Sequence, residues 1–593
     1  MAVAPEKPGR ASSVCPHFST PNDYRPAESQ PSFASQTHLP VSAVLAATVP
    51  AAWLLPNHYF PWPSAWQDGL ALALLGAAAL NCPRRGEVPQ AWLVVCLLAI
   101  GSAAFQWIAG LILFTGDALL VVLYVSSFLL SIALGSALVG DAARPGRDLI
   151  LAAVALGTLA SAMVSSFIAL VQWTGAISLG IYGVDLRPGA RPYANVAQAN
   201  HFCSLSFLGL CAAAQLRELR KIGPTVFWIV CGLLLWSMVM SGSRTGWVQL
   251  VGLLMLVVAR QRSAPTHLGA IGAVALLGLF ALGSWVWPWV NAVTLLGGVR
   301  ADVAGLQGAG GRELFWPTVL DAIRREPLGG YGWQQAFMAQ LAVAADHPPV
   351  HRHFEHTHNL VLDLFVWAGV PIGLVIVLLS SLALVRQLRA VDDPRALWLV
   401  IPVFGLVLHA MFEFPLEFAY FLLPVGIALG AAHALAPGAR SVSWPMPWIR
   451  VAGAALGLLL LLIALDYLRA EENHRTLRLE SARIGVERLE TPAPRLHLLD
   501  QQQAFLEFAR TEATLNMPKE EIEKMRRVAE RFGYPPALFR YALAAGLNGQ
   551  PDVAEITLRR LCHIHPPLRC EEAREAWRVL QARYNVLNEV RLP

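Results

Sequence analysis

Apolar stretches of roughly 20 residues follow one another along positions 41–470 of the chain. A stretch of this length crosses the hydrocarbon core of a bilayer as an α-helix, because each helical residue advances about 1.5 Å. Only 14% of the 593 residues are charged, whereas soluble domains carry about 25%. The repeated pattern therefore predicts an all-α polytopic membrane protein made of spanning helices.

The apolar stretches predict about thirteen transmembrane helices. The fourth stretch is longer than a bilayer is thick, so its helix must tilt or extend beyond the membrane. The helices are expected at 41–56, 65–81, 90–107, 111–140, 148–173, 201–216, 224–240, 245–259, 268–290, 358–385, 396–412, 416–435 and 449–468.

Basic residues occur in alternate short loops between these stretches, and the alternation predicts the topology. Arg84 and Arg85 lie in one loop, for example, whereas the next loop, 108–111, has no Lys or Arg. Basic loops stay on the cytoplasmic side, so we expect the N-terminus in the cytoplasm and residues 470–593 on the opposite side. The net charge of +5 is spread over these loops, which argues against a nucleic-acid-binding face.

The chain divides into three predicted regions. Residues 1–40 are rich in Pro and Ser and are expected to be a disordered cytoplasmic tail. Residues 41–469 form the transmembrane domain, which we expect to carry the active site and which includes a large loop at 291–357. Residues 470–593 are expected to form a separate helical domain outside the membrane.

Two further patterns occur in the regions outside the membrane. In the large loop, a Gly-rich stretch at 297–311, expected to be mobile, precedes a short amphipathic helix that ends before Pro327. This helix would lie on the bilayer surface or cap the helical bundle. Residues 536–561 indicate a helix–turn–helix, either a tetratricopeptide-like pair or part of a small bundle with no binding role.

Cys562 and Cys570 flank the sequence His-Ile-His-Pro-Pro in the predicted external domain. An oxidising compartment would join them in a disulfide. The alternative is a pair of buried free thiols. No Cys-x-x-Cys pair occurs in the chain, so a cysteine-based zinc site is not expected.

Residues 351–359, His-Arg-His-Phe-Glu-His-Thr-His-Asn, place four histidines directly before an apolar stretch. Titratable groups at the mouth of an apolar body indicate an active site. Metal binding, a hydrated loop without a role, and general-base or hydrogen-bonding catalysis are the three alternatives. The spacing matches no standard zinc motif, so we favour catalysis by His358 with Asn359 and His356, without a metal or a cofactor.

Four other residues are candidates for the same site. Arg244 lies in a tight turn, Ser-Gly-Ser-Arg-Thr-Gly-Trp, and Arg312 begins the amphipathic helix. Arginine binds phosphate oxygens bidentately, so these two could clamp a diphosphate, although an interface anchor and a solvated charge are the alternatives. Glu413 and Asp363 lie near predicted helix ends, where a carboxylate needs a partner, and both could instead be structural hydrogen-bonding groups.

Six motifs occur in a fixed order along the chain. They are Tyr-Ala-Asn-Val-Ala-Gln-Ala-Asn-His, Ser-Gly-Ser-Arg-Thr-Gly-Trp, Gly-Arg-Glu-Leu-Phe-Trp, Glu-Pro-Leu-Gly-Gly-Tyr-Gly, His-Thr-His-Asn-Leu and Glu-Phe-Pro-Leu. In this order, with a long loop before the His motif, the sequence resembles the superfamily of bacterial O-antigen ligases and Wzy-type polymerases. Within that superfamily it is most similar to the O-linking protein oligosaccharyltransferases of the PglL type.

The resemblance implies a GT-C-like glycosyltransferase of the bacterial inner membrane, with its active site and C-terminal domain in the periplasm. The donor would be an oligosaccharide on undecaprenyl diphosphate, and the acceptor a hydroxyl of a periplasmic, pilin-like protein. Membrane lipids would surround the enzyme, and no nucleic acid or cofactor would take part. Ligation to lipid A core and glycan polymerisation are the alternatives in the same class, and a transporter or flippase is the alternative from another class.

The resemblance also assigns roles to individual residues. It places the essential histidine at His358 and the two diphosphate-binding arginines at Arg244 and Arg312. The extra His351 and His353 have no counterpart in the family pattern. The remaining candidates for the site, substrate-binding or supporting, are Arg191, Gln198, Asn200, Asp363, Glu413 and Tyr420.

Overall fold

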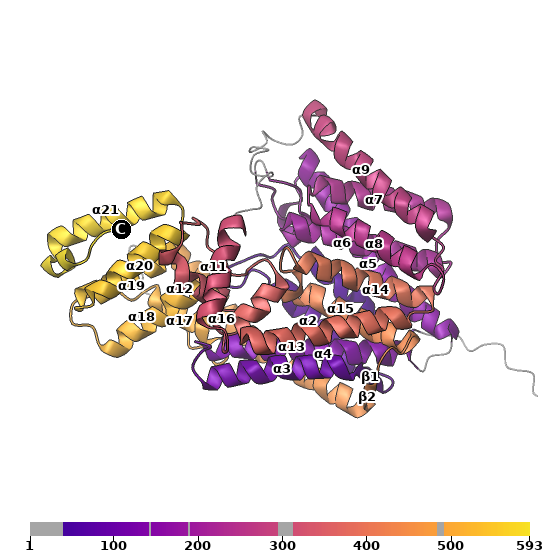
Figure 1. Ribbon diagram of the computed structural model, residues 1–593, viewed down its shortest axis with the longest axis horizontal. Coiled ribbons are helices and arrows are strands. Elements are labelled where there is room, and N and C mark those ends of the chain that lie inside the picture. Colours follow the sequence, from indigo (N-terminus) through magenta and orange to yellow (C-terminus); the bar gives the residue numbers. More distant parts are fainter. Residues whose placement is uncertain (1–38, 141–143, 188–189, 295–311, 483–490) are drawn as a thin grey trace, which may run out of the picture. The chain divides into compact units, whose positions relative to one another are not determined.

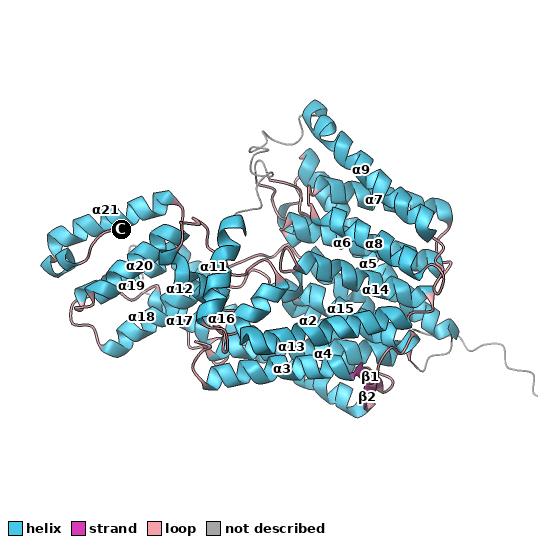
Figure 2. Cartoon of the chain, in the orientation of Figure 1, coloured by secondary structure: helices cyan, strands magenta, loops and turns pink. Residues whose placement is uncertain are grey.

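The computed structural model describes residues 39–140, 144–187, 190–294, 312–482 and 491–593. Helices dominate this part of the chain, as Figure 2 shows. Residues 1–38 of the predicted N-terminal tail and the whole Gly-rich stretch 297–311 lie outside the described residues.

A helix occupies each of the predicted spanning stretches (Figure 1). Among the described residues, six of them (α3, α4, α5, α9, α13 and α16) are long and apolar enough to cross a membrane. The chain is thus a multi-pass membrane protein, while the count of thirteen crossings stays a prediction. The helices are α1 (Val41–Thr48) with η1 (Val49–Leu54), α2 (Ala65–Leu80), α3 (Gln90–Ile108), α4 (Thr115–Val139), α5 (Arg144–Thr174), α6 (Ala199–Glu218), α7 (Pro224–Met240), α8 (Thr245–Arg260), α9 (Gly269–Thr294), α13 (Leu360–Ala390), α14 (Pro394–Ala410), α15 (Ala419–Leu435) and α16 (Met446–Ser481).

Helices α4 and α15 pack closely at the centre of this bundle. A Cβ atom on Gly135 would overlap the backbone of Ile427, and one on Gly430 would overlap the backbone of Ile132. Small residues let helix backbones approach each other where no hydrophobic effect drives them together. The contact fixes α15, whose N-terminal end carries part of the candidate site.

One two-stranded antiparallel sheet departs from the all-α prediction. Strand β1 (Gly86–Pro89) pairs with β2 (Ser441–Trp444), with Gly86 opposite Trp444. Each strand has only four residues, which is too short to give a sequence signal by alternation. The sheet joins two interhelical loops that are far apart along the chain.

The large loop folds into α11 (Arg312–Arg325) and α12 (Ala336–Val343). The predicted amphipathic helix is confirmed, because Phe315, Val319 and Ile323 are buried. They belong to one apolar cluster with residues of α3 and α13. Of the two predicted arrangements, the helix therefore packs on the helical bundle.

Beyond the bundle, α16 continues past the predicted end at residue 468 to Ser481, and five more helices follow. The predicted helix–turn–helix is confirmed as α19 and α20, while its tetratricopeptide-like role stays a hypothesis. Cys562 and Cys570 form a disulfide with their Cα atoms 4.7 Å apart. The five helices are α17 (Asp500–Phe508), α18 (Lys519–Phe532), α19 (Pro535–Leu547), α20 (Pro551–Ile564) and α21 (Pro567–Arg583).

These C-terminal helices attach to the N-terminal end of α4. The Asp500 carboxylate accepts hydrogen bonds from the amides of Thr115 (3.0 Å) and Gly116 (2.7 Å). Orphan amides at a helix start are normally satisfied by a local side chain, so here the C-terminal region supplies the cap. Arg531 forms a two-pronged ion pair with buried Asp117, at 2.7 and 3.0 Å.

Candidate active site

His358 lies in a loop whose end is fixed by the following residue. The Asn359 side chain caps α13 by accepting hydrogen bonds from the amides of Val361 (3.0 Å) and Leu362 (3.1 Å). Its amide group also donates to the Met411 carbonyl, 3.1 Å away. His358 itself has a φ of 57°, a conformation that few non-glycine residues adopt. Asn359 therefore holds the backbone beside His358 in place.

Three of the predicted residues, His358, Glu413 and Asn200, come from separate parts of the chain and meet at the Glu413 carboxylate. The Nδ1 atom of His358 lies 2.8 Å from Oε2 of Glu413, and Oε1 of Glu413 accepts a hydrogen bond from Asn200 at 3.0 Å. A carboxylate can only accept, so Nδ1 carries the proton in this arrangement. The Nε2 atom of the neutral ring is then the basic nitrogen.

A second imidazole–carboxylate pair lies next to the first. His356 Nδ1 is 2.8 Å from Oε2 of Glu417, which ends the short helix η5 (Pro415–Glu417). The ring of Phe414 stacks on His356 with centroids 4.3 Å apart and meets His358 edge-on at 5.2 Å. Glu417 and Phe414 were not among the predicted site residues. Glu417 is a carboxylate only four residues after Glu413, and this spacing is the signal by which it could have been matched to His356.

The His356–Glu417 pair leads to a prediction for stability against pH. Burial alone would lower the pKa of His356, but the facing Glu417 carboxylate outweighs it and raises the pKa to about 9. A raised pKa means that the protonated ring stabilises the fold fully below its ordinary pKa of about 6.5, and that this contribution is lost as the pH rises through 9. We expect the melting temperature in detergent to fall between pH 7 and 9.5, and to fall less in Glu417→Gln. Equal pH slopes in the two proteins would contradict this.

Asp363 forms a hydrogen bond with the loop that carries His358. Its Oδ1 atom accepts a hydrogen bond from the Thr357 amide at 2.7 Å, and its side chain is buried. The Thr357 carbonyl accepts a hydrogen bond from Trp316 of α11 at 2.9 Å. The candidate Asp363 therefore positions residues beside His358, and Trp316 of α11 binds the same loop through a second hydrogen bond.

Two candidate arginines lie together near Glu413. The Arg191 guanidinium donates to the Gly242 carbonyl at 3.0 Å, in the turn just before Arg244, which is the N-cap residue of α8. Burial lowers the pKa of Arg191; the charge of Glu413 opposes this shift and that of Arg244 adds to it. Two neighbouring guanidinium groups at the edge of the bundle form a setting suited to an anion.

The structure places the other three candidates as follows. Gln198 caps α6 by accepting from the His201 amide at 2.7 Å. Tyr420 is buried in the first turn of α15 and stacks on Phe418 with centroids 5.1 Å apart. Helix α11 begins at Arg312, and the Arg312 side chain lies outside the described part of the structure.

An apolar cavity of about 340 Å³ opens beside this group of residues. Its walls come from α3, α4, α13, α14 and α15, and include Phe128, Trp367 and Val425. Met411 and Glu417, which contact Asn359 and His356, also line it. The cavity therefore connects the interior of the bundle with the histidine loop.

The four histidines of the loop do not converge on one point. His356 and His358 face Glu417 and Glu413, whereas His351 and His353 contact the C-terminal helices. Within the residues that the structure describes, no three His, Cys, Asp or Glu side chains are grouped as ligands for a metal ion.

Known protein families match two parts of the chain, and individual known proteins are similar to it. Residues 229–378 match the family described as O-antigen ligase, and residues 395–584 match the family described as virulence factor membrane-bound polymerase, C-terminal. A general O-oligosaccharyltransferase of Acinetobacter baylyi is 29% identical over 530 residues, which cover 88% of this chain and 91% of the relative. A ComP-specific O-oligosaccharyltransferase of the same organism is 28% identical over 247 residues, 40% of this chain and 43% of the relative. No solved structure matches the chain.

Proposed function

Because this chain resembles the bacterial O-oligosaccharyltransferases along most of its length, we propose that it is a glycosyltransferase that moves an oligosaccharide from a lipid-linked donor to a protein hydroxyl. The observation that carries the proposal is the contact of His358 with Glu413, which also accepts a hydrogen bond from Asn200 and lies near two arginines. A basic nitrogen, a fixed carboxylate and an anion-binding edge are the groups that such a transfer needs.

The donor in this proposal is a glycan on undecaprenyl diphosphate. The apolar cavity beside the histidine loop suits a polyprenyl chain, since its lining is almost wholly hydrocarbon. Arg191 and Arg244 would receive the diphosphate at the edge of the bundle, and Arg312, the first residue of α11, stays a third candidate for this role. The head and tail of one lipid would then lie on either side of His358.

The reaction proceeds by direct displacement. Nε2 of His358 accepts the proton of a Ser or Thr hydroxyl, and the hydroxyl oxygen attacks the anomeric carbon of the glycan. The bond from that carbon to the diphosphate breaks, and the diphosphate leaves with the electron pair toward the arginines. One displacement inverts the configuration, and no covalent enzyme intermediate or metal ion is required.

In this proposal the protein lies in the bacterial inner membrane with His358 at the periplasmic face. The alternation of basic loops supports the orientation. The acceptor is a periplasmic protein, for which a pilin-like protein is the first candidate. Residues 470–593 would lie on the same side as the acceptor.

Transfer to lipid A core and glycan polymerisation are rival functions, because the matched families include an O-antigen ligase and a membrane-bound polymerase. Purified protein should be given an undecaprenyl-diphosphate glycan, a pilin-type protein and lipid A core together, in the presence of EDTA. Mass spectrometry that finds the glycan on Ser or Thr of the protein supports our proposal. Transfer only to lipid A core, or only to another glycan, contradicts it.

Glu413→Gln tests the role of the carboxylate beside His358. The amide keeps the size of the side chain but removes the charge that holds the Nδ1 proton, so we expect kcat to fall about tenfold. The KM for the donor should change less than twofold, because Glu413 does not bind the leaving diphosphate in this mechanism. Steady-state transfer kinetics measure both values, and an unchanged kcat would contradict the assignment.

A further inference from the structure

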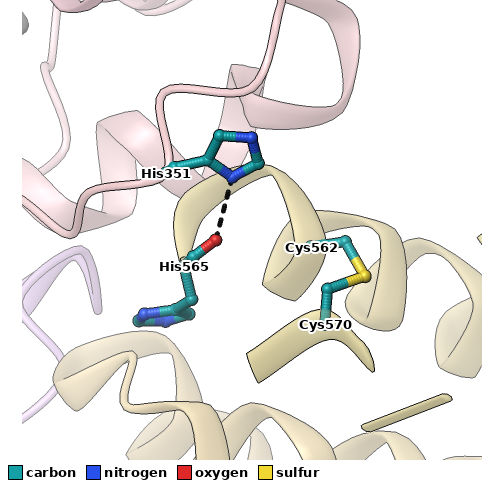
Figure 3. The surroundings of a disulfide bond; sticks show 4 residues. All are labelled: His351, Cys562, His565 and Cys570. Carbon is teal, nitrogen blue, oxygen red and sulfur yellow. Dashed lines mark hydrogen bonds between the residues drawn. A yellow bond between two sulfur atoms is a disulfide. The ribbon is translucent and has the colours of Figure 1, made fainter. Parts of the chain in front are cut away.

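The turn between α20 and α21 is closed by the disulfide between Cys562 and Cys570, eight residues apart (Figure 3). The bond joins the last turn of one helix to the first turn of the next, so the intervening residues, 563–569, have little freedom. Both cysteines are buried. The turn contains His563 and His565, and both residues form hydrogen bonds with residues 344–351, which precede His358 in the chain.

This turn binds the segment that leads to His358. The His563 carbonyl accepts hydrogen bonds from the amides of Val350 and His351, each at 3.0 Å. The ring of His351 donates from Nδ1 to the His565 carbonyl at 3.0 Å, as Figure 3 shows. In return, Nδ1 of His563 is within 2.8 Å of the Ala344 carbonyl. Backbone carbonyls only accept, so both rings must be protonated at Nδ1.

The backbone of His351 has a φ of 55°, in the left-handed region that non-glycine residues rarely adopt. Such a conformation persists when surrounding contacts determine it. At His351 the hydrogen bonds to the disulfide-closed turn are those contacts. Without them we expect this backbone to relax and to redirect the residues that follow.

The fixed segment continues to His358 through packed rings. The ring of His353 contacts Phe337 at 4.4 Å and His565 at 5.9 Å between centroids. The Phe354 amide donates to Gln340 at 3.0 Å. The Phe354 ring meets the His358 ring edge-on at 5.6 Å. A shift at His351 would therefore move the contacts of His358 itself.

We propose that the disulfide-closed turn 562–570 is a positioning element of the active site, which holds residues 350–354 and through them sets the position of His358. The C-terminal helices then complete the catalytic loop from outside the membrane domain. The His563 carbonyl binds the amides of Val350 and His351, and the His565 carbonyl binds the ring of His351. The catalytic consequence rests on the proposed function, whereas the docking of the turn on the loop does not.

Hydrogen exchange followed by mass spectrometry tests the docking without any catalytic assay. The full-length protein in detergent is compared before and after reduction with a phosphine, with thiol labelling to establish that Cys562 and Cys570 have been reduced. We expect exchange in peptides covering 348–356 to become about tenfold faster, because opening the turn frees the acceptor of the Val350 and His351 amides. Peptides from α14 should not change. Unchanged exchange at 348–356 after complete reduction would overturn the proposal.

A double variant, Cys562→Ala with Cys570→Ala, controls for other effects of the reductant. It should show the faster exchange at 348–356 without reductant and should not respond further to it. The five other cysteines in the described residues are free and buried, so they offer the reductant no disulfide there. A response to reductant that persists in the double variant would show that the effect does not come from the Cys562–Cys570 bond, and would overturn the proposal.

A matched pair of variants at His351 tests the effect on catalysis. Asn and Asp have the same size and both tolerate the left-handed conformation, but only Asn can donate a hydrogen bond to the His565 carbonyl. We expect His351→Asn to keep kcat within about twofold and His351→Asp to lower it about tenfold, with the KM for the donor unchanged in both. Equal kcat values in the two variants would show that the contact does not position His358.

Failure of this inference differs from failure of the proposed function. If transfer is absent from the wild-type protein but exchange at 348–356 still depends on the disulfide, the docking holds and the function is wrong. If transfer occurs and exchange is insensitive to the disulfide, the function holds and this inference is wrong.

Discussion

Replacing His358 by alanine is expected to lower the rate of glycan transfer about 10²–10⁴-fold. The change removes the only base that the mechanism uses, and leaves the acceptor hydroxyl to lose its proton to water. Because Arg191 and Arg244 are unchanged, the KM for the polyprenyl-diphosphate donor should stay within about threefold. Single-turnover transfer with saturating donor and acceptor measures the chemical step directly.

His347→Ala is the matched control for His358→Ala. His347 lies in the same loop region and pairs with Asp321 at 2.9 Å, but it does not contact His358 or Glu413 in the structure described here. We expect this variant to keep transfer within about twofold. Near-normal transfer by His358→Ala, or an equal loss in both variants, would remove His358 as the general base.

Replacing Arg531 by methionine is expected to destabilise the docked C-terminal helices by about 3 kcal/mol. Asp117 is only 1% exposed, so the variant leaves a carboxylate in a buried place without the guanidinium that faces it. Loss of the ion pair also weakens the attachment of α18 to the start of α4. Thermal unfolding in detergent and limited proteolysis between residues 491 and 593 report the two consequences.

Two further variants test whether the effect of Arg531→Met comes from the lost ion pair with Asp117. Arg526→Met changes the same kind of residue in the same helix. Arg526 pairs with Glu523 at 2.6 Å and with Glu530, which are both more exposed than Asp117, so we expect a cost of only about 0.5–1 kcal/mol. Adding Asp117→Asn to Arg531→Met should recover part of the loss, because no buried charge then remains. A double variant as unstable as their summed single effects would mean that the two residues do not interact.

The helices of the bundle could be predicted because their signal is local. Inside a bilayer, the backbone N–H and C=O groups of an apolar segment must be satisfied by hydrogen bonds within its own helix. Helices such as α3 and α9 therefore coincide with their predicted stretches within a few residues. The amphipathic helix was predictable for the same reason, because its apolar residues Phe315, Val319 and Ile323 recur at every fourth position. The two four-residue strands could not be predicted, because a pairing between loops far apart along the chain produces no repeating pattern of residues in the sequence.

The candidate site was predictable as a set of residues but not as an arrangement. Local sequence was enough to select His358, Glu413 and Asn200 as candidates, because each is a titratable or polar residue near the end of a predicted helix. Their contacts join positions 55 and 213 residues apart, and no spacing along the chain specifies such pairs. The partner of His356 was missed because Glu417 becomes its neighbour only when η5 folds back on the loop.

By itself, the sequence determined the class of protein, the approximate positions of its helices and the residues able to do chemistry, because hydrophobicity and charge act on each segment separately. The tertiary structure decided which carboxylate faces which imidazole, and it divided one run of four histidines between two sets of contacts. It also placed a disulfide-closed turn from the far end of the chain against the loop of His358. The physical reason is that hydrogen bonds and ion pairs act over about 3 Å, a range within which only the folded chain brings distant residues together.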